Sequence, residues 1–187
     1  MSCYQTIVDR VTVHNYAAGA VDKALVERAL GAATAAPNHR LTEPWRFVCV
    51  GPASRQRLME IARELREAAL GAKLPEAAVA KLREKMLNPA ELIVVGRLRD
   101  PSPDVEREDY AAVACAIHGL MLVLSEAGVG SKWTTGEVTR DERTYRLLEI
   151  DRDSQEIVGF VWVGVAQGST PKPRRRKALE QVVRFVP

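Results

Sequence analysis

Apolar residues recur at helical intervals in four segments of the chain. In 22–36 they fall at spacings of three and four residues, which places them on one face of a helix, and Asp22 is a suitable N-cap. The charged segments 55–70 and 75–86 repeat this spacing. The segment 104–128 begins charged and then becomes apolar almost all round a helix. We therefore predict four long helices, of which the last is the most apolar.

Three continuous apolar runs indicate strands. The run 45–51 is aromatic and β-branched, while 91–98 and 157–166 lack the polar alternation of a strand with one face in solvent. Between them, 128–136 is predicted to be a glycine-containing loop and 140–148 a short helix. With helices before and between three strands, we expect an α+β or α/β protein.

The apolar helix at 104–128 also bears on assembly. A helix that is apolar on every side is buried in a core or between subunits, and one small domain of 187 residues cannot cover all of it. This predicts an obligate homodimer. His118, on that helix, is expected to be an interior or interface histidine, and Cys49 and Cys115 to be buried packing residues.

Length and composition narrow the class of protein. The 187 residues fit one domain with a tail after 168, and 47% hydrophobic with 27% charged residues is ordinary globular usage. No uncharged stretch reaches the roughly 20 residues that span a bilayer, and the first ten residues lack the features of a secretory signal. We expect a cytoplasmic protein without a membrane partner. Three isolated cysteines and three isolated histidines predict no metal site.

The formal charge of +3 is unevenly distributed. The segment PKPRRRK at 171–177 holds five cations, and without them the formal charge becomes −2. One interpretation is a nucleic-acid-binding module that acts through counterion release. Few aromatic residues, an acidic remainder and no recognisable binding fold weigh against it, so no nucleic-acid partner is expected.

Four separated segments could bind an anionic ligand that carries a ring. Arg10 and Thr12 can hold a phosphate by charge-assisted hydrogen bonds. The polar loop at 37–44 is fixed by a proline at each end and leads into a strand where Trp45 and Phe47 share one face and are expected in the core. The last two segments are the turn 132–136, with its backbone N–H groups, and the basic run 174–177.

Together these segments resemble the nitroreductase family of flavin enzymes, in particular its small members. The family's Arg-Arg-Ser stands here as Arg10-Val11-Thr12, and its motif that begins with Ala-Pro and ends with Pro-Trp-x-Phe stands as APNHRLTEPWRF. An alanine-rich helix leading to Trp133 and the basic stretch follow in the same order. Val11 replaces the usual second arginine and Glu43 the usual glutamine, so Glu43 is expected to face away or to pair with Arg40 or Arg46.

The resemblance implies an architecture for residues 1–187 as a whole. It implies a single-domain α+β nitroreductase-like fold, with a mostly antiparallel central sheet flanked by helices, a buried central helix at a dimer interface, and an extended basic tail at 168–187. It also implies FMN bound without a covalent link, in sites that both subunits of a homodimer build.

The resemblance further implies roles for individual residues. Arg10 and Thr12, around Val11, would hold the FMN phosphate or ribityl chain with Arg174 and Arg176 of the tail. His39 would reach the flavin from the neighbouring subunit. The ring edge would be lined by Trp133, Thr134, Thr135 and Gly136. The amide of Thr135 or Gly136 would donate to flavin N5 or O4, and no catalytic side chain is expected.

The implied reaction is a ping-pong oxidoreduction. NADH or NADPH would reduce the flavin and leave, and a nitroaromatic- or quinone-type acceptor would then enter the same space. Positive charge and N–H donors near the flavin N1–O2 edge would stabilise its reduced form. The alternative interpretation keeps the flavin without the reductase activity, as a carrier or as an enzyme of flavin breakdown or dehalogenation.

Overall fold

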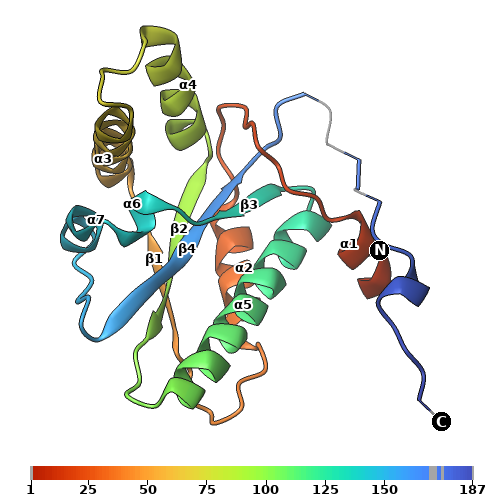
Figure 1. Cartoon of the computed structure of the whole chain (residues 1–187). Helices are drawn as coiled ribbons and strands as arrows, with labels where there is room; N and C mark the ends of the chain where they lie inside the picture. Colours follow the sequence, from red (N-terminus) through yellow and green to blue (C-terminus); the bar gives the residue numbers. More distant parts are fainter. Residues whose placement is uncertain (1, 169–171, 174, 187) are drawn as a thin grey trace.

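The computed structural model describes residues 2–168, 172–173 and 175–186. The chain forms a four-stranded antiparallel sheet in the order β1-β2-β4-β3, with helices on both faces (Figure 1). Its strands are β1 (Trp45–Cys49), β2 (Glu91–Leu98), β3 (Gly130–Thr134) and β4 (Gln155–Gly164). The expected α+β fold with an antiparallel sheet is confirmed.

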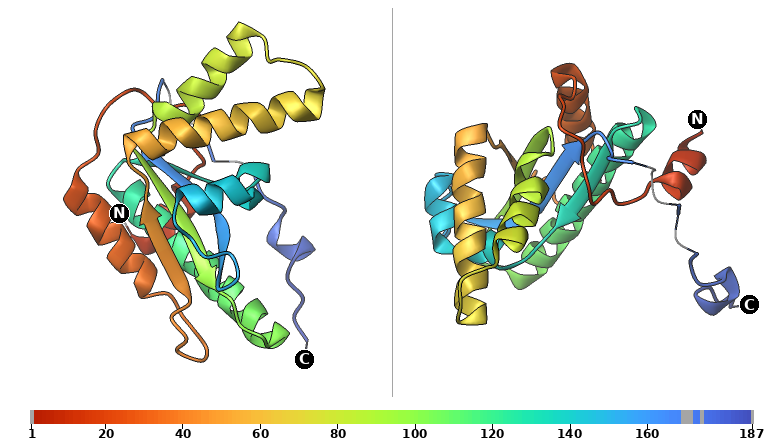
Figure 2. Two further views of the ribbon diagram at one scale, coloured as in Figure 1. Left: turned by 90° about the vertical axis from the view of Figure 1, so that its left-hand side faces the viewer. Right: turned by 90° about the horizontal axis from the view of Figure 1, so that it is seen from above.

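Helices form two layers around this sheet (Figure 2). One face is covered by α2 and α5, and the other by α3, α4, α6 and α7. The helices are α1 (Cys3–Asp9), α2 (Lys23–Thr34), α3 (Pro52–Leu70), α4 (Glu76–Leu87), α5 (Pro103–Glu126), α6 (Glu137–Arg140), α7 (Glu142–Leu147) and the 3-10 turn η1 (Leu179–Gln181).

The two central strands are apolar on both sides because each side faces a helix layer. Ile93 and Val95 of β2 lie in the core with α2 and α5, whereas Leu92 and Val94 lie in the core with α3 and α4. All four side chains have no exposed surface. The prediction of a strand buried on both faces is confirmed.

Helix α5 is the longest element, with 24 residues. It is long and apolar enough to cross a membrane by length and composition, but its buried side packs on α2 and the sheet, and a core helix of a soluble protein meets the same criteria. Its other side remains exposed in the single chain, including Tyr110, Ala111, Cys115 and His118. Only part of the apolar surface of α5 is therefore buried in the core of the single chain.

Two elements differ from the sequence-based prediction. The segment predicted as a loop at 128–136 contains the edge strand β3, and α1 was not predicted. Gly128, with φ of 74°, ends α5 and lets the chain turn back at once into β3. An edge strand needs only one buried face, and β3 is too short and polar to show an apolar run.

The prediction that Cys49 and Cys115 are buried is wrong, because both are exposed. Cys49 is the last residue of the edge strand β1, and Cys115 lies on the uncovered side of α5. Partial burial, together with the charge of Glu91, raises the pKa of the Cys49 thiol, so this thiol is not activated as a nucleophile. Trp45 and Phe47 do pack in the core, as predicted.

Candidate functional site

The segment that follows α1 runs along the free edge of β3. Thr12 bridges Ser131, the Val13 amide donates to the Ser131 carbonyl at 3.1 Å, and Tyr16 bridges Ala166. These contacts bring residues 10–16 beside the sheet. Two segments that the sequence analysis singled out, 10–12 and 132–136, are thereby neighbours in space.

Arg10 has buried hydrogen-bond donors that could bind an anion. Its Nε and Nη1 atoms are buried and have no hydrogen-bond partner among the described residues. A buried guanidinium without acceptors is costly, and it favours an anion that offers several oxygens, such as a phosphate. Val11 points elsewhere and lines a separate cavity of about 120 Å³ with Val13.

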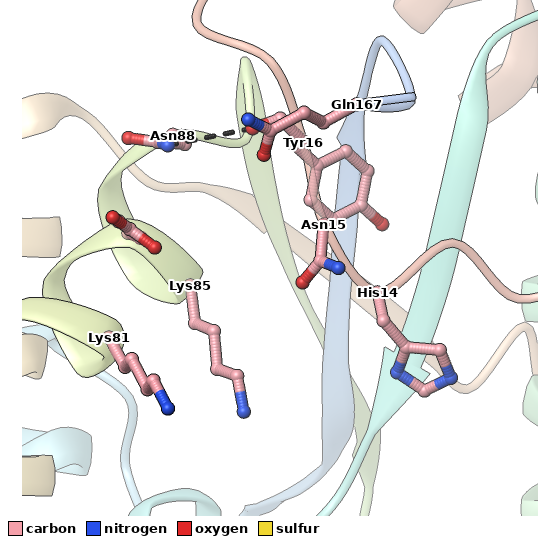
Figure 3. Close-up of a pocket in the computed structure, with 8 residues that line it drawn as sticks. His14, Asn15, Tyr16, Lys81, Lys85, Asn88 and Gln167 are labelled. Atoms are coloured by element: carbon pink, nitrogen blue, oxygen red, sulfur yellow. Dashed lines mark hydrogen bonds between the residues drawn. The ribbon is translucent and has the colours of Figure 1, made fainter. Parts of the chain in front are cut away.

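A cavity of about 250 Å³ opens between α4 and the segment 14–16 (Figure 3). Its residues were not predicted from the sequence, although Lys81 and Lys85 stand four apart on one face of a predicted helix. The cavity is lined by His14, Asn15, Tyr16, Lys81, Glu84, Lys85, Asn88 and Gln167. Among these described lining residues Glu84 is the only acid, so the cavity has an excess of positive charge.

Lys132 of β3 adds a third lysine to this region. It is half-buried, and burial lowers the pKa of its ammonium group. The charge of Lys85 lowers that pKa further, so the two lysines lie close enough to repel each other. Such a pair of like charges is stabilised by a bound anion.

Tyr16 and Asn88 hold the inner end of this cavity together. The buried Tyr16 hydroxyl donates to the Trp162 carbonyl at 3.3 Å, and Asn88 Nδ2 donates to the Tyr16 carbonyl at 3.5 Å. Burial raises the pKa of the Tyr16 phenol well above its ordinary value, so it stays protonated. Tyr16 therefore acts as a structural bridge between β4 and the end of α4.

The turn after β3 lines a smaller cavity of about 100 Å³ with Thr134, Thr135 and Gly136. Gly136 has φ of 151°, which L side chains rarely adopt, and it begins α6. Thr134 Oγ1 accepts a hydrogen bond from Trp162 Nε1 at 2.9 Å. Met86, next to Lys85 on α4, lines the same cavity.

Trp133 lies on the opposite face of the sheet from this turn. Its side chain packs against the core formed with α2 and α5, and its Nε1 is buried without a partner among the described residues. Lys132 and Thr134 point the other way because side chains alternate along a strand. Within one chain, Trp133 is therefore a packing residue.

His39 lies far from these cavities in the same chain. Its Nδ1 is 3.1 Å from Glu108 Oε2, which Arg40 Nε also contacts at 2.9 Å. The hydrogen bond from Arg40 and then that from His39 lower the pKa of Glu108. Glu108 lies near the start of α5, and β3 follows the helix's end about 27 Å away along its axis. Arg40 thus pairs with Glu108 and not with Glu43.

The loop that carries His39 is held in one conformation. Thr42 Oγ1 donates to the buried Asp109 Oδ1 at 2.6 Å, and the Glu43 amide donates to Asn38 Oδ1 at 2.8 Å. Leu41 and Glu43 both have left-handed backbone angles, φ of 52° and 45°. These hydrogen bonds fix an exposed loop that is remote from the cavities of its own chain.

The basic tail leaves the sheet on the side of the molecule where α1 lies (Figures 1 and 2). Arg176 is exposed, together with Lys172, Arg175 and Lys177. Arg174 lies outside the described residues. The structure of one chain therefore does not join the tail to Arg10.

Comparison with known protein families shows to which family this chain belongs. The model of the Nitroreductase family matches residues 7–165. The chain belongs to the nitroreductase family. The resemblance carried by its four motifs is thus confirmed.

Individual nitroreductase relatives cover nearly the whole chain. YfhC of Bacillus subtilis, a candidate NAD(P)H nitroreductase, is 25% identical over 181 residues, which are 92% of this chain and 88% of YfhC. The nitroreductase-like protein of Bacillus cereus has a TM-score of 0.83 at 25% identity and covers 100% of this chain and 96% of its own. A variant of the FMN and NADPH-dependent nitroreductase NfnB from sphigopyxis has a TM-score of 0.78 at 18% identity, with 99% of both chains covered.

In this member of the nitroreductase family, one edge of the sheet therefore gathers the segment 12–16, the lysine-lined cavity and the turn 134–136, and Arg10 lies two residues before Thr12. The loop of His39 and the tail stay apart from that edge within a single chain. The described residues contain no group of three His, Cys, Asp or Glu side chains that could hold a metal ion.

Proposed function

We propose that this protein is an FMN-dependent oxidoreductase that takes hydride from NADH or NADPH and reduces nitroaromatic- or quinone-type acceptors in a ping-pong cycle. The observation that carries the proposal is the guanidinium of Arg10, whose buried Nε and Nη1 atoms have no partner in the described part of a nitroreductase-family chain. A phosphate supplies the acceptors that this guanidinium needs. NfnB, of the same fold, is named as FMN- and NADPH-dependent.

The residues present fit FMN at its two ends. Arg10 and Thr12 would hold the phosphate, with Arg174 and Arg176 contributing from the tail. The family resemblance leads us to expect positive charge near the N1–O2 edge of the ring, and we assign this charge to Lys85 and Lys132. The amides of Thr135 and Gly136 remain the proposed donors to the ring.

Bound FMN would supply the hydride and electron transfer, and the protein supplies position and electrostatics. Lys132 contributes most to the electrostatics, because it is half-buried and its charge is less screened than that of a surface lysine. Lys85 and Lys132 repel each other until negative charge arrives between them. Their arrangement therefore favours negative charge on the ring over a neutral ring.

We also propose a homodimer in which each site takes residues from both subunits. Large apolar side chains stay exposed on α1, α5 and the tail, including Tyr4, Tyr110, Leu179, Val182 and Phe185. The apolar side of α5 would meet its copy, and the His39 loop, remote from its own site, would reach the other subunit's flavin. His118 on that side of α5 would be an interface residue. Trp133 packs on the other face of β3 in its own chain, and its contact with the ring edge stays a prediction of the resemblance.

Sedimentation of the purified protein tests the dimer. We expect dimers at micromolar concentration with FMN bound. A monomer that retains FMN at that concentration would contradict the shared site. The cytoplasmic location remains a prediction from the sequence.

An anaerobic spectrum tests the reaction. The purified protein should be yellow, and the flavin absorbance should bleach when NADH or NADPH is added without oxygen. Addition of a nitroaromatic or a quinone should then restore the absorbance. A protein that binds FMN but is bleached by neither nicotinamide would instead be a carrier or an enzyme of divergent flavin chemistry, the alternative that Val11 and Glu43 motivate.

A further inference from the structure

Lys81 and Lys85 reach into one cavity from the same face of α4 (Figure 3). They stand one helical turn apart, about 6 Å along the axis. The residues that follow the two lysines, Leu82 and Met86, are buried against the body of the protein, and this packing sets the orientation of the helix. Asn15 and His14 lie across from the two lysines on the N-terminal segment.

These two lysines are not equivalent. The charge of Lys85 acts on Lys132, which burial already affects, so Lys85 belongs to the inner group beside β3. Lys85 is three residues from Asn88, which bonds Tyr16 at the inner end of the cavity, whereas Lys81 lies one turn farther from that end. If the inner pair faces the cofactor, Lys81 faces the space beyond it.

The charge around Lys81 is not balanced within the chain. Of the described residues that line the cavity, Glu84 is the only acid, against two lysines. The ion pairs found in the described part of the chain involve neither Lys81 nor Lys85. A ligand with its own negative charge is therefore favoured at this position over a neutral one.

We propose that Lys81 selects an electron acceptor that is an anionic aromatic compound, with a carboxylate or sulfonate on the ring that bears the reducible group. This inference rests on the proposed function, and it names the substrate class of that site. For a nitro compound, the hydride of NAD(P)H and one proton from solvent convert the nitro group to a nitroso group and one water, and leave NAD(P)⁺. The carboxylate takes no part in these bonds and serves only recognition.

A matched pair of acceptors tests the proposal on the FMN-loaded dimer. We compare kcat/KM for 4-nitrobenzoate with kcat/KM for 4-nitrobenzamide, so that the variant-to-wild-type ratio cancels intrinsic reactivity. Lys81→Met should lower the benzoate-to-benzamide ratio about fivefold, mainly through KM. Lys73→Met, which removes an exposed lysine outside the cavity, is the control and should leave the ratio unchanged.

Three outcomes would overturn the proposal. An unchanged ratio in Lys81→Met would show that the lysine does not read the acceptor, and an equal loss in Lys73→Met would show a general effect of net charge. A loss confined to the KM of NADPH would assign Lys81 to a nucleotide phosphate instead, which also overturns it.

A binding measurement separates this inference from the proposed function. Calorimetric titration of the FMN-loaded protein with benzoate and benzamide requires no turnover. Tighter binding of benzoate in wild type, lost in Lys81→Met, supports the inference even if no acceptor is reduced. Equal affinities for benzoate and benzamide in wild type would refute it, even in an active reductase.

Discussion

The indole ring of Trp133 lies against the α-carbon of Gly159 on the neighbouring strand β4. A Cβ at Gly159 would overlap the indole Nε1, and would also lie 2.7 Å from Cδ1 and 2.9 Å from the Thr134 carbonyl oxygen. Only glycine therefore allows Trp133 to pack here while Thr134 and Thr135 continue toward the opposite face. The geometry of the turn at 134–136 depends on this contact.

We expect Gly159→Ala to lower the free energy of unfolding by about 1–3 kcal/mol, because the added methyl must displace Trp133 or the backbone of β3. Urea denaturation measures the change. Combining it with Trp133→Leu should recover part of the loss, since the clash with the indole is gone. The control is Gly31→Ala in α2, where a Cβ meets nothing within 4 Å, and it should be neutral or stabilising.

Arg55 of α3 forms hydrogen bonds with the end of α4, and we expect its loss to make α4, which lines the lysine-lined cavity, less stable. Its guanidinium is buried and donates to the carbonyls of Met86, Pro89 and Ala90, with the contact to Pro89 at 2.6 Å. Arg55→Met leaves these carbonyls without a donor, at a cost of about 1–3 kcal/mol. Faster hydrogen exchange in α4 than in α5 is expected. Equally faster hydrogen exchange in α4 and α5, or the same effect from the exposed Arg57→Met, would contradict a local stabilisation of α4 by Arg55.

Lys132→Met should stabilise the apoprotein. Because burial lowers the pKa of Lys132, the unfolded chain binds more protons than the folded one between that lowered pKa and about 10.5. Stability of the wild type therefore rises with pH across this window, and below it the buried charge is unfavourable. Thermal unfolding of the apoprotein at several pH values should show a higher Tm in the variant at neutral pH and a smaller gain toward alkaline pH. A lower Tm at neutral pH would show that the charge is stabilised within the chain.

Arg10→Ala should weaken FMN binding by at least about tenfold, since it removes the charge-assisted hydrogen bonds to the phosphate. Fluorescence quenching of added FMN measures the affinity. Arg28→Ala, an exposed arginine of α2, serves as the control and should bind FMN like the wild type. Binding of riboflavin, which has no phosphate, should differ little between wild type and Arg10→Ala.

The sequence was sufficient where one strong local signal fixed an element. Continuous apolar runs located β2 and β4, and the 3.6-residue period located α2 to α5, because both patterns reflect burial of whole faces. The edge strand β3 and the exposure of Cys49 were not predicted, since an edge strand is covered on one side only. The role of Arg10 rested on a motif and stays a prediction, which the buried, unpartnered Nε and Nη1 atoms in the described part of the chain support.

The lysine-lined cavity could not be predicted because no single segment forms it. His14 was an isolated histidine, and Lys81 and Lys85 looked like the solvated side of an amphipathic helix. Only the antiparallel return of β4 and the pairing of residues 12–16 along the sheet edge bring α4 opposite the N-terminal segment. A site of this kind depends on how the elements are arranged in the fold, which no local sequence pattern shows.

The midpoint potential of bound FMN tests most directly whether Lys85 and Lys132 face the flavin. Each lysine, if it favours negative charge on the ring, should make the potential less negative. We therefore expect Lys132→Met to shift the potential negative by about 30 mV, which corresponds to a tenfold loss in the relative affinity for reduced over oxidised FMN. Lys23→Met, at an exposed site on α2, should leave it unchanged. A potential in Lys132→Met equal to that of the wild type would contradict this account.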